Sequence, residues 1–302
     1  MKYVDPTKNT FSFSKNQVPA MYADSGDVLL FTAMDTYSDL LTSEESKPSV
    51  DMVGVPVNPL NGPVYINGAK PGDMLKVVIE DIIIDCSEGT MHLNHDGKLG
   101  TKYFKEYVEG EHIFKIPMSG NQANMFGHIL DLCPMIGDIG VAYDEKELNT
   151  MVPYRNGGNM DFKLLGKGTT IYFPVFVEGA LLCMGDIHAH QGDGEIVSGL
   201  EVPGKIQVKV EVIKDQNNGW PFMETKDRWY VLCSALTVDE AIEIVMHEVV
   251  EFVRKYGGDK HTVHEWLLLL AMFGDLEICQ SVDPMVTVRY GIDKKVLGET
   301  LF

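Results

Sequence analysis

Alternating hydrophobic and polar positions dominate the first two-thirds of the chain and predict a mainly β protein. In KIQVKVEVI every second residue is apolar, so a strand there would turn one face inward and the other outward. Other runs rich in valine, isoleucine, phenylalanine and tyrosine, bounded by turn residues, predict further strands. The expected strands cover residues 27–35, 74–84, 169–177, 205–213 and 285–292, and turn-rich connectors are expected at 56–63 and 67–73.

Near residue 237 the apolar spacing changes to that of a helix. TVDE (237–240) is typical of a helix N-terminus, and the apolar stripe after it ends before a glycine pair at 257–258, which suits a left-handed helix end. A second start, TVHE (262–265), predicts a shorter helix through the apolar run 266–273. This run is too short to span a membrane, so we expect it to be buried core or a subunit contact.

Together these elements predict a β-rich α+β protein, a jelly-roll-like β-sandwich or barrel with a helical hairpin late in the chain. The chain of 302 residues is long enough for one large domain or two moderate ones. We expect a single unit over residues 1–302, within which a β-sandwich part, 1–165, and an α+β part, 166–302, are a possible subdivision.

The charge balance of the chain excludes some kinds of ligand. The chain has 25 lysines and arginines against 44 acids, a formal charge of −19, which repels nucleic acid and anionic lipid surfaces. We therefore expect no nucleic-acid or membrane partner and a ligand that is neutral, cationic or a metal. Five cysteines without CxxC spacing indicate reduced thiols, and with no apolar run of about 18 residues the sequence predicts a cytoplasmic protein.

One short stretch, GDIHAHQGDGE (185–195), gathers five titratable side chains directly after an apolar run. If 184–190 forms a strand, Asp186, His188 and His190 project from one face. Their oxygen and nitrogen atoms suit zinc or another first-row divalent ion, and the glycines that follow would turn the chain back toward the same end of the sheet. The stretch therefore predicts a metal-centred hydrolytic site, with a solvated strand face or a hydrogen-bonded polar cluster as the structural alternative.

Four segments resemble the acetamidase/formamidase family, in the order in which the family carries them: GPVYINGAKPGD (62–73), GGNMDFK (157–163), GTTIYFPVFVEGALLCMGDIHAHQGDGE (168–195) and GDLEICQSVDP (274–284). The resemblance implies hydrolysis of short amides to carboxylate and ammonia, a β-rich jelly-roll-like fold, a divalent metal with zinc as the usual candidate, and a homo-oligomer. It also implies a second possible activity, because the family includes enzymes that open γ-lactams.

The resemblance and the strand pattern together assign the site residues. Metal ligation is expected from Asp35, Asp186, His188 and His190, catalysis from Glu195 and Asp193, and substrate contact from Gly157, Gly158, Asn159 and Asp161. Glu195 would act as the proton shuttle, and the glycine N–H groups would face a developing oxyanion. In relatives a histidine commonly precedes the GGN stretch, whereas Tyr154, Arg155 and Asn156 stand there in this chain.

The reaction expected from these assignments is attack of metal-bound water on a small neutral amide. The alternatives are a non-catalytic jelly-roll protein that binds a metal or ligand, and a metal-dependent isomerase or dioxygenase with iron. A nucleophilic Ser198 or Cys183 is a further alternative, although no GxSxG motif is present. His92, His95 and Asp96 are expected to be loop residues.

Overall fold

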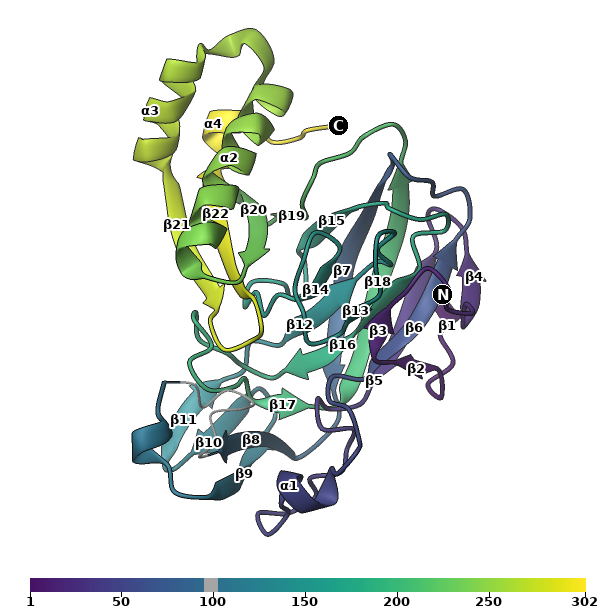
Figure 1. Cartoon of the computed structure of the whole chain (residues 1–302), viewed down its shortest axis with the longest axis vertical. Coiled ribbons are helices and arrows are strands. Elements are labelled where there is room, and N and C mark those ends of the chain that lie inside the picture. The colour runs from purple at the N-terminus through teal and green to yellow at the C-terminus, as the bar shows by residue number, and fades with distance from the viewer. Residues whose placement is uncertain (95–102) are drawn as a thin grey trace.

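Two large β-sheets and a set of late helices make up the computed structural model, which describes residues 1–94 and 103–302 (Figure 1). The nine-stranded sheet runs in the order β1-β5-β18-β7-β15-β19-β20-β22-β21. Its strands are β1 (Lys2–Tyr3), β5 (Val28–Ala33), β7 (Met74–Ile84), β15 (Thr170–Pro174), β18 (Gly204–Ile213), β19 (Phe222–Glu224), β20 (Arg228–Ala235), β21 (Gly274–Gln280) and β22 (Val286–Asp293). Strands from both sides of residue 165 alternate in this sheet, since β18 lies between β5 and β7.

The eleven-stranded sheet contains the path β11-β10-β9-β8-β17-β16-β12-β14, with β6 paired to β16 and carrying β2 and β4. Its strands are β2 (Asn9–Thr10), β4 (Met21–Ala23), β6 (Leu60–Ile66), β8 (Glu88–Asn94), β9 (Glu111–Ser119), β10 (Gln122–Met125), β11 (His128–Asp131), β12 (Met135–Gly140), β14 (Gly157–Asn159), β16 (Leu182–His188) and β17 (Glu201–Val202). The remaining elements are β3 (Ser12–Phe13), β13 (Leu148–Asn149), α1 (Pro48–Asp51), α2 (Val238–Gly257), α3 (Val263–Phe273), α4 (Lys294–Leu297) and the 3-10 turns η1 (Lys105–Tyr107) and η2 (Gly258–Lys260).

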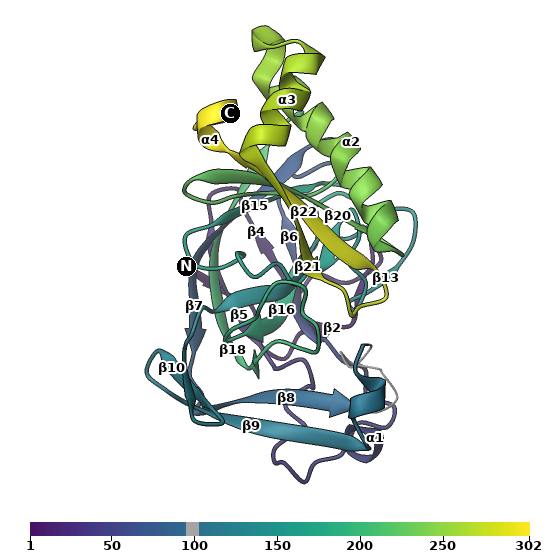
Figure 2. The ribbon, with the colours of Figure 1, turned by 90° about the vertical axis from the view of Figure 1, so that its left-hand side faces the viewer.

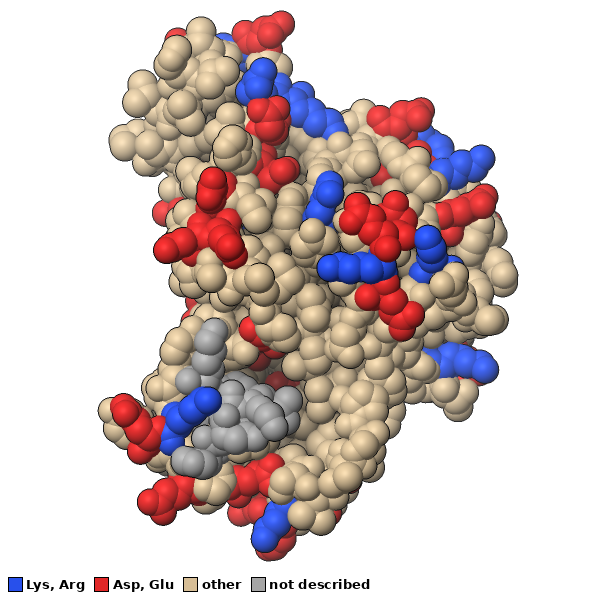
Figure 3. Space-filling model, viewed as in Figure 1, with Lys and Arg blue, Asp and Glu red and all other residues tan. Residues whose placement is uncertain are grey.

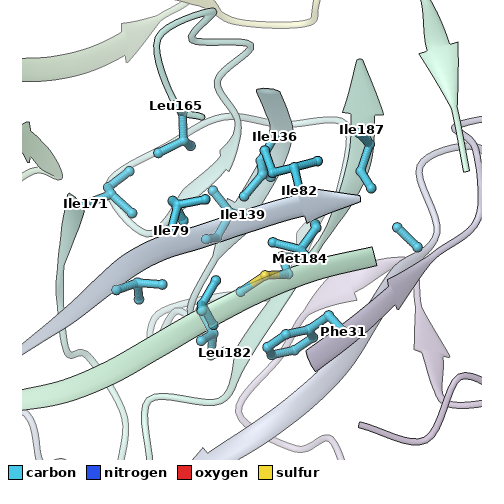
Figure 4. Packing of buried hydrophobic residues seen from close by; sticks show 14 of the residues in the cluster. Phe31, Ile79, Ile82, Ile136, Ile139, Leu165, Ile171, Leu182, Met184 and Ile187 are labelled. Carbon is cyan, nitrogen blue, oxygen red and sulfur yellow. The ribbon is translucent and has the colours of Figure 1, made fainter. Parts of the chain in front are cut away.

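The main core lies between the two sheets. Along β18 the alternation seen in the sequence places Ile206, Val208 and Val210 inside. Figure 4 shows how apolar side chains of the two sheets meet there, among them Phe31, Ile79, Ile82, Ile136, Ile139, Leu182, Met184 and Ile187. Each fully buried side chain of this kind contributes about 1.5–3 kcal/mol, so this core holds the sheets together face to face.

A second core forms where α2 packs on β20 and β22, as Figures 1 and 2 both show. The helix begins where the Thr237 side chain accepts a hydrogen bond from the Glu240 N–H at 3.2 Å, as the sequence predicts. It extends one residue further than expected, through Gly257, and the left-handed position falls on Gly258, with φ 59°. The capping box of Thr262 and Glu265 likewise starts α3.

The predicted β-rich α+β fold with a late helical hairpin is confirmed, and each of the five expected strands is present within a few residues. Three details differ. The expected connector at 56–63 already contains the start of β6 at Leu60. The apolar run of α3 is fully buried only at Trp266 and Leu270, with Leu269 half-buried beside them, because Leu267, Leu268, Met272 and Phe273 are exposed. His92 is a fully buried residue of β8 and not a loop residue, while His95 and Asp96 lie outside the described residues.

None of the helices in residues 1–94 and 103–302 combines the length and apolar character that crossing a bilayer requires.

Candidate metal centre

The end of β16 brings an imidazole and two carboxylates together. His188, the last residue of β16, pairs in register with Glu201 of β17. Its Nε2 atom lies 3.0 Å from a Glu201 carboxylate oxygen and 3.5 Å from an Asp186 carboxylate oxygen. All three side chains are buried, with exposed fractions of 4% or less. The structure therefore places Asp186 and His188 side by side, and Glu201 joins them from the neighbouring strand.

A hydrogen-bond relay fixes the orientation of the His188 ring. The Gln191 amide nitrogen donates to the Asp161 carbonyl oxygen at 3.0 Å, which leaves the Gln191 amide oxygen facing His188 Nδ1 at 2.6 Å. Because that oxygen can only accept, Nδ1 carries a hydrogen. Nε2 is the ring nitrogen that faces the two carboxylates. A histidine held in this way by an outer partner is the usual arrangement for a metal ligand.

Further acids surround this histidine. Three overlapping groups have ligand atoms within 4.8 Å of one another: Asp161, Asp186 and His188; His188, Glu195 and Glu201; and Asp161, Glu195 and Asp283. Hydrogen-bond donors are missing at several of their buried oxygens, namely both Asp161 Oδ atoms, Asp186 Oδ1 and Glu195 Oε2. Buried carboxylates without donors are unfavourable unless protons or cations neutralise them. The donor set therefore fits a divalent cation.

Burial and mutual repulsion shift the acids toward their protonated forms. Burial raises the pKa of Asp161 to about 6 and that of Glu201 to about 8, although the nearby His188 opposes both shifts. The pKa values of Glu195 and Asp283 are raised well above their usual range by burial and by the Asp161 carboxylate. Burial lowers the pKa of His188, but the Glu201 and Asp186 carboxylates outweigh it and raise that pKa overall. The same field that favours protons here favours a metal cation.

A cavity of about 50 Å³ opens onto these groups. Its lining includes Asp186, His188, Glu195, Glu201 and Asp283 together with neutral side chains such as Tyr37, Asn58 and Asn159. In Figure 3, acidic side chains are visible deep in a hollow on this face of the molecule. The site is thus a small, acid-lined pocket.

Two asparagines on the wall of the cavity are held in fixed orientations. Asn58 donates to Asn159 at 3.0 Å, and Asn159 in turn donates to the Asp283 carboxylate at 2.7 Å. Asn159 thereby fixes Asp283 at the edge of the cavity. Asp283 was not among the site residues predicted from the sequence.

Several acidic residues of the site have backbone conformations that are unfavourable for residues with a side chain. Asp161, Asp186 and Glu195 have φ angles of 46°, 53° and 38°, in the left-handed region. Such conformations are each unfavourable by about 1–3 kcal/mol and tend to persist at functional sites. Opposite them Gly137 leaves the space that the Asp161 and Asp186 carboxylates occupy, because a Cβ there would lie 2.6 Å from Asp161 Oδ1.

Three of the predicted site residues lie apart from these groups. The Asp35 carboxylate accepts the N–H groups of Tyr37 at 3.0 Å and Asp39 at 2.7 Å, so it closes a turn. His190 follows the end of β16, where strand alternation no longer applies, and its Nδ1 is buried without a partner. Asp193 is paired with Arg289 at 2.6 Å and Lys163 at 2.5 Å. Within the described part of the chain, none of the three candidate groups contains these residues.

The expected oxyanion role of the glycines conflicts with their contacts. The Gly157 N–H donates to the Tyr154 carbonyl at 3.0 Å, so it is not available to a substrate. Gly158, with φ 87°, packs against the Val152 backbone, and neither glycine lines the cavity. The two glycines allow β14 to pack closely, while Asn159 lines the cavity and Asp161 lies beside it. At the position where relatives carry histidine, the Asn156 side chain donates to the Val141 carbonyl and is buried.

The sequence did not assign four polar residues at or near the site: the buried Tyr37, Asp138 and Glu201, and the half-buried Asp283. Glu201 lies between Leu200 and Val202, and an acid inside a short apolar run signals a buried, functional carboxylate. Asp283 belongs to the segment 274–284 that already carried the family resemblance.

Comparison with known proteins identifies relatives of this chain. The acetamidase/formamidase family model matches residues 142–230. The formamidase of Methylophilus methylotrophus is 27% identical, over 77% of this chain and 75% of that protein. Two crystal structures resemble almost the whole chain: an acetamidase from Bacillus halodurans (34% identity, TM-score 0.92, 98% of this chain and 99% of that one) and a predicted acetamidase/formamidase from Thermoanaerobacter tengcongensis (37%, TM-score 0.90, 98% and 97%). The chain belongs to the acetamidase/formamidase family.

Membership of the acetamidase/formamidase family confirms the resemblance stated from the sequence, and with it the prediction of an amidohydrolase. A γ-lactamase from Delftia acidovorans, 19% identical with a TM-score of 0.64, shares the fold.

Proposed function

We propose that this acetamidase/formamidase family member hydrolyses small neutral linear amides, such as formamide and acetamide, to a carboxylate and ammonia with the help of a divalent metal ion. The observation that carries the proposal is the buried His188, whose Nε2 faces the carboxylates of Asp186 and Glu201 beside a small cavity. The names of the relatives support the choice of amides.

The residues suited to hold the ion are Asp161, Asp186 and His188, one of the three groups with mutually close ligand atoms. One nitrogen and two carboxylate ligands suit zinc, which is the ion we expect. A bound divalent ion supplies Lewis acidity, which lowers the pKa of water and polarises the amide carbonyl. Gln191 contacts Nδ1 of the His188 ring and so keeps the ring aligned, while Glu201 lies beside Nε2, the nitrogen that would face the ion.

Glu195 is placed to move the proton. It lines the cavity, its Oε2 has no hydrogen-bond partner, and it belongs to a group that includes His188. Glu195 takes a proton from the attacking water as the new C–O bond forms, and delivers it to the amide nitrogen as the C–N bond breaks. Ammonia then leaves, and the carboxylic acid that remains loses its own proton at neutral pH to give the carboxylate.

The cavity limits the size of the substrate. A site for one water needs about 10–15 Å³ on this measure, so a cavity of about 50 Å³ has room for roughly three or four non-hydrogen atoms. Formamide and acetamide are of that size. The acidic lining disfavours anionic substrates and favours neutral ones.

The test is ammonia release from formamide, acetamide, butyramide and 2-pyrrolidinone together with metal analysis. We expect the two smallest amides to be preferred, and Glu195→Gln to lower turnover by roughly 100- to 10,000-fold with the metal retained. The exposed Glu178→Gln serves as the matched control and should keep full activity. Full activity of Glu195→Gln would remove the proton-shuttle role, and bound metal without consumption of any amide would favour the non-catalytic alternative.

We also propose a homo-oligomer, because one apolar surface is left open. This α3–β21 face consists of Leu267, Leu268, Met272, Phe273, Leu276 and Ile278, all of them exposed. In Figure 3 the corner that α3 occupies in Figure 1 is almost free of charged side chains. Since β21 ends the nine-stranded sheet, two copies related by a two-fold axis could pair their β21 edges and cover both faces.

Light scattering tests the oligomer. We expect a mass above that of one chain for the wild type, and a lower mass for Leu268→Glu. Val50→Glu, at an equally exposed apolar position away from this face, should not change the mass. A monomeric wild type would contradict the proposal.

A further inference from the structure

The oxygen of an amide substrate needs a hydrogen-bond donor in the cavity. A carbonyl oxygen accepts hydrogen bonds, and it accepts them more strongly when water adds to the carbon and the oxygen becomes an oxyanion. Ionised carboxylates can only accept, so the acids of the lining do not supply this donor. The N–H groups of Gly157 and Gly158 do not supply it either, because neither glycine lines the cavity. The neutral side chains of the lining are therefore the candidates.

Most hydroxyl and amide groups of the lining already have an acceptor. The Thr36 hydroxyl donates to Asn58 Oδ1, and the Asn58 amide donates to Asn159 at 3.0 Å. The Ser198 hydroxyl donates to the next backbone carbonyl along the chain at 3.0 Å. Each asparagine has a second amide hydrogen, so Asn58 and Asn159 are alternative donors. The Tyr37 hydroxyl differs from these groups, because among the described residues the only hydrogen bonds of Tyr37 are made by its backbone.

The Tyr37 side chain is held at the wall of the cavity. Its backbone N–H donates to the Asp35 carboxylate at 3.0 Å, in the turn that Asp35 closes. The ring is 3% exposed and lies edge-on to the His92 ring, with the ring centroids 6.0 Å apart. It packs with three further apolar side chains, those of Leu41, Met52 and Ile113. Asp35, which the sequence assigned to the metal, thus orients a residue that lines the cavity.

Acids act on the hydroxyl end of this side chain. Burial, followed by the carboxylates of Glu201, Asp35 and Asp186, raises the pKa of Tyr37 well above its usual range. The phenol therefore keeps its proton and remains a donor. Since Glu201 and Asp186 line the same cavity, the hydroxyl lies on the side of the ring where a substrate would react.

We propose that the Tyr37 hydroxyl donates a hydrogen bond to the carbonyl oxygen of the amide substrate and stabilises that oxygen as an oxyanion. When water adds, a C–O bond forms and the π electron pair of the carbonyl moves onto the oxygen that Tyr37 contacts. The pair returns as the C–N bond breaks, so Tyr37 neither gains nor loses a proton. This role rests on the proposed function, because it assumes amide hydrolysis in this cavity.

Tyr37→Phe tests the role, because it removes the hydroxyl and keeps the ring. We expect kcat for acetamide to fall by about 100- to 1,000-fold with a much smaller change in KM, since the hydrogen bond is strongest in the transition state. Tyr172→Phe is the matched control and should keep the wild-type kcat. Tyr172 is also 3% exposed, and its hydroxyl donates to Glu224 at 2.8 Å in the second core, away from the cavity. A loss that appears in KM alone would overturn the role.

Thioacetamide gives a readout that a merely structural role of Tyr37 would not change. Sulfur accepts hydrogen bonds more weakly than oxygen, so the loss of kcat/KM caused by Tyr37→Phe should be clearly smaller for thioacetamide than for acetamide. Equal losses for the two substrates would overturn the hydrogen bond to the substrate oxygen. A fully active Tyr37→Phe would overturn it as well and leave Asn58 or Asn159 as the donor. A wild type that hydrolyses no amide would overturn the proposed function, and the role of Tyr37 with it.

Discussion

At the scale of single residues, Arg289 shows how the loop that carries Glu195 is held. Its guanidinium is 1% exposed and donates twice to Asp193, at 2.6 and 2.9 Å, and once to Glu277 at 3.0 Å. Lysine cannot form this planar, two-pronged contact. We expect Arg289→Lys to lower the free energy of unfolding by about 1.5–3 kcal/mol and to reduce kcat more than it raises KM.

Denaturant unfolding and amide hydrolysis of the same samples check this expectation. Arg254→Lys, on the exposed side of α2, is the control. An unchanged kcat in a clearly destabilised Arg289→Lys protein would show that Arg289 supports folding alone.

Gly137 offers a second test at this scale, because its missing side chain makes room for two acids. A Cβ at this position would lie 2.6 Å from Asp161 Oδ1 and closer still to Asp186 Oδ2. Gly137→Ala should therefore displace both carboxylates and lower zinc affinity by at least about tenfold. Zinc titration against a competing chelator measures the change. Gly192→Ala, where an added Cβ meets nothing within 4 Å, should retain wild-type affinity, and equal affinities in the two variants would contradict the crowding argument.

At the scale of elements, Asp73 ties the start of β7 to the end of β18. Its carboxylate accepts the Lys70 N–H at 2.9 Å and the Asp215 N–H at 3.1 Å, and pairs with the Lys214 ammonium. Burial opposes ionisation, but these contacts outweigh it and lower the pKa of Asp73. Asp73→Asn should lower the free energy of unfolding by about 1–3 kcal/mol near pH 7.

The sign of the pH dependence follows from the lowered pKa. The stabilisation by ionised Asp73 is complete above the unfolded-state pKa, about 3.9, and is lost as the pH falls through the lower folded-state value. The difference in stability between wild type and Asp73→Asn should therefore be constant from pH 7 to pH 5 and shrink below about pH 4. Urea unfolding across this range measures it, and a difference that shrinks already between pH 7 and pH 5 would contradict the assignment.

Elements with a strong local period were predictable from the sequence, and those defined by pairing between distant strands were not. The alternation in β18 and the capping signals of α2 and α3 depend on neighbouring residues, so they can be read directly. Glu201 reaches His188 only through the register of β17 with β16. The placement of Asp186 beside His188 was anticipated, but where β16 ends was not, and none of the candidate groups among the described residues contains His190. The metal roles themselves stay predictions.

At the scale of the whole molecule, the buried acids should make stability depend on metal. A ligand that binds only the folded chain adds about 2.7 kcal/mol when its free concentration is 100 times Kd. We expect chelation to lower the melting temperature of the wild type and zinc to restore it. His188→Gln should respond much less to zinc, and equal responses of the two proteins would contradict binding at His188.

The place of β18 in the nine-stranded sheet has a consequence for how the chain matures. Because β18 lies between β5 and β7 in the sheet, these two earlier strands leave the ribosome long before their shared neighbour is made. Their unpaired backbone edges stay open to wrong partners during that interval. β5 and β7 can therefore form their native pairing only after residues more than a hundred positions downstream have been synthesised. The native sheet is completed late in synthesis.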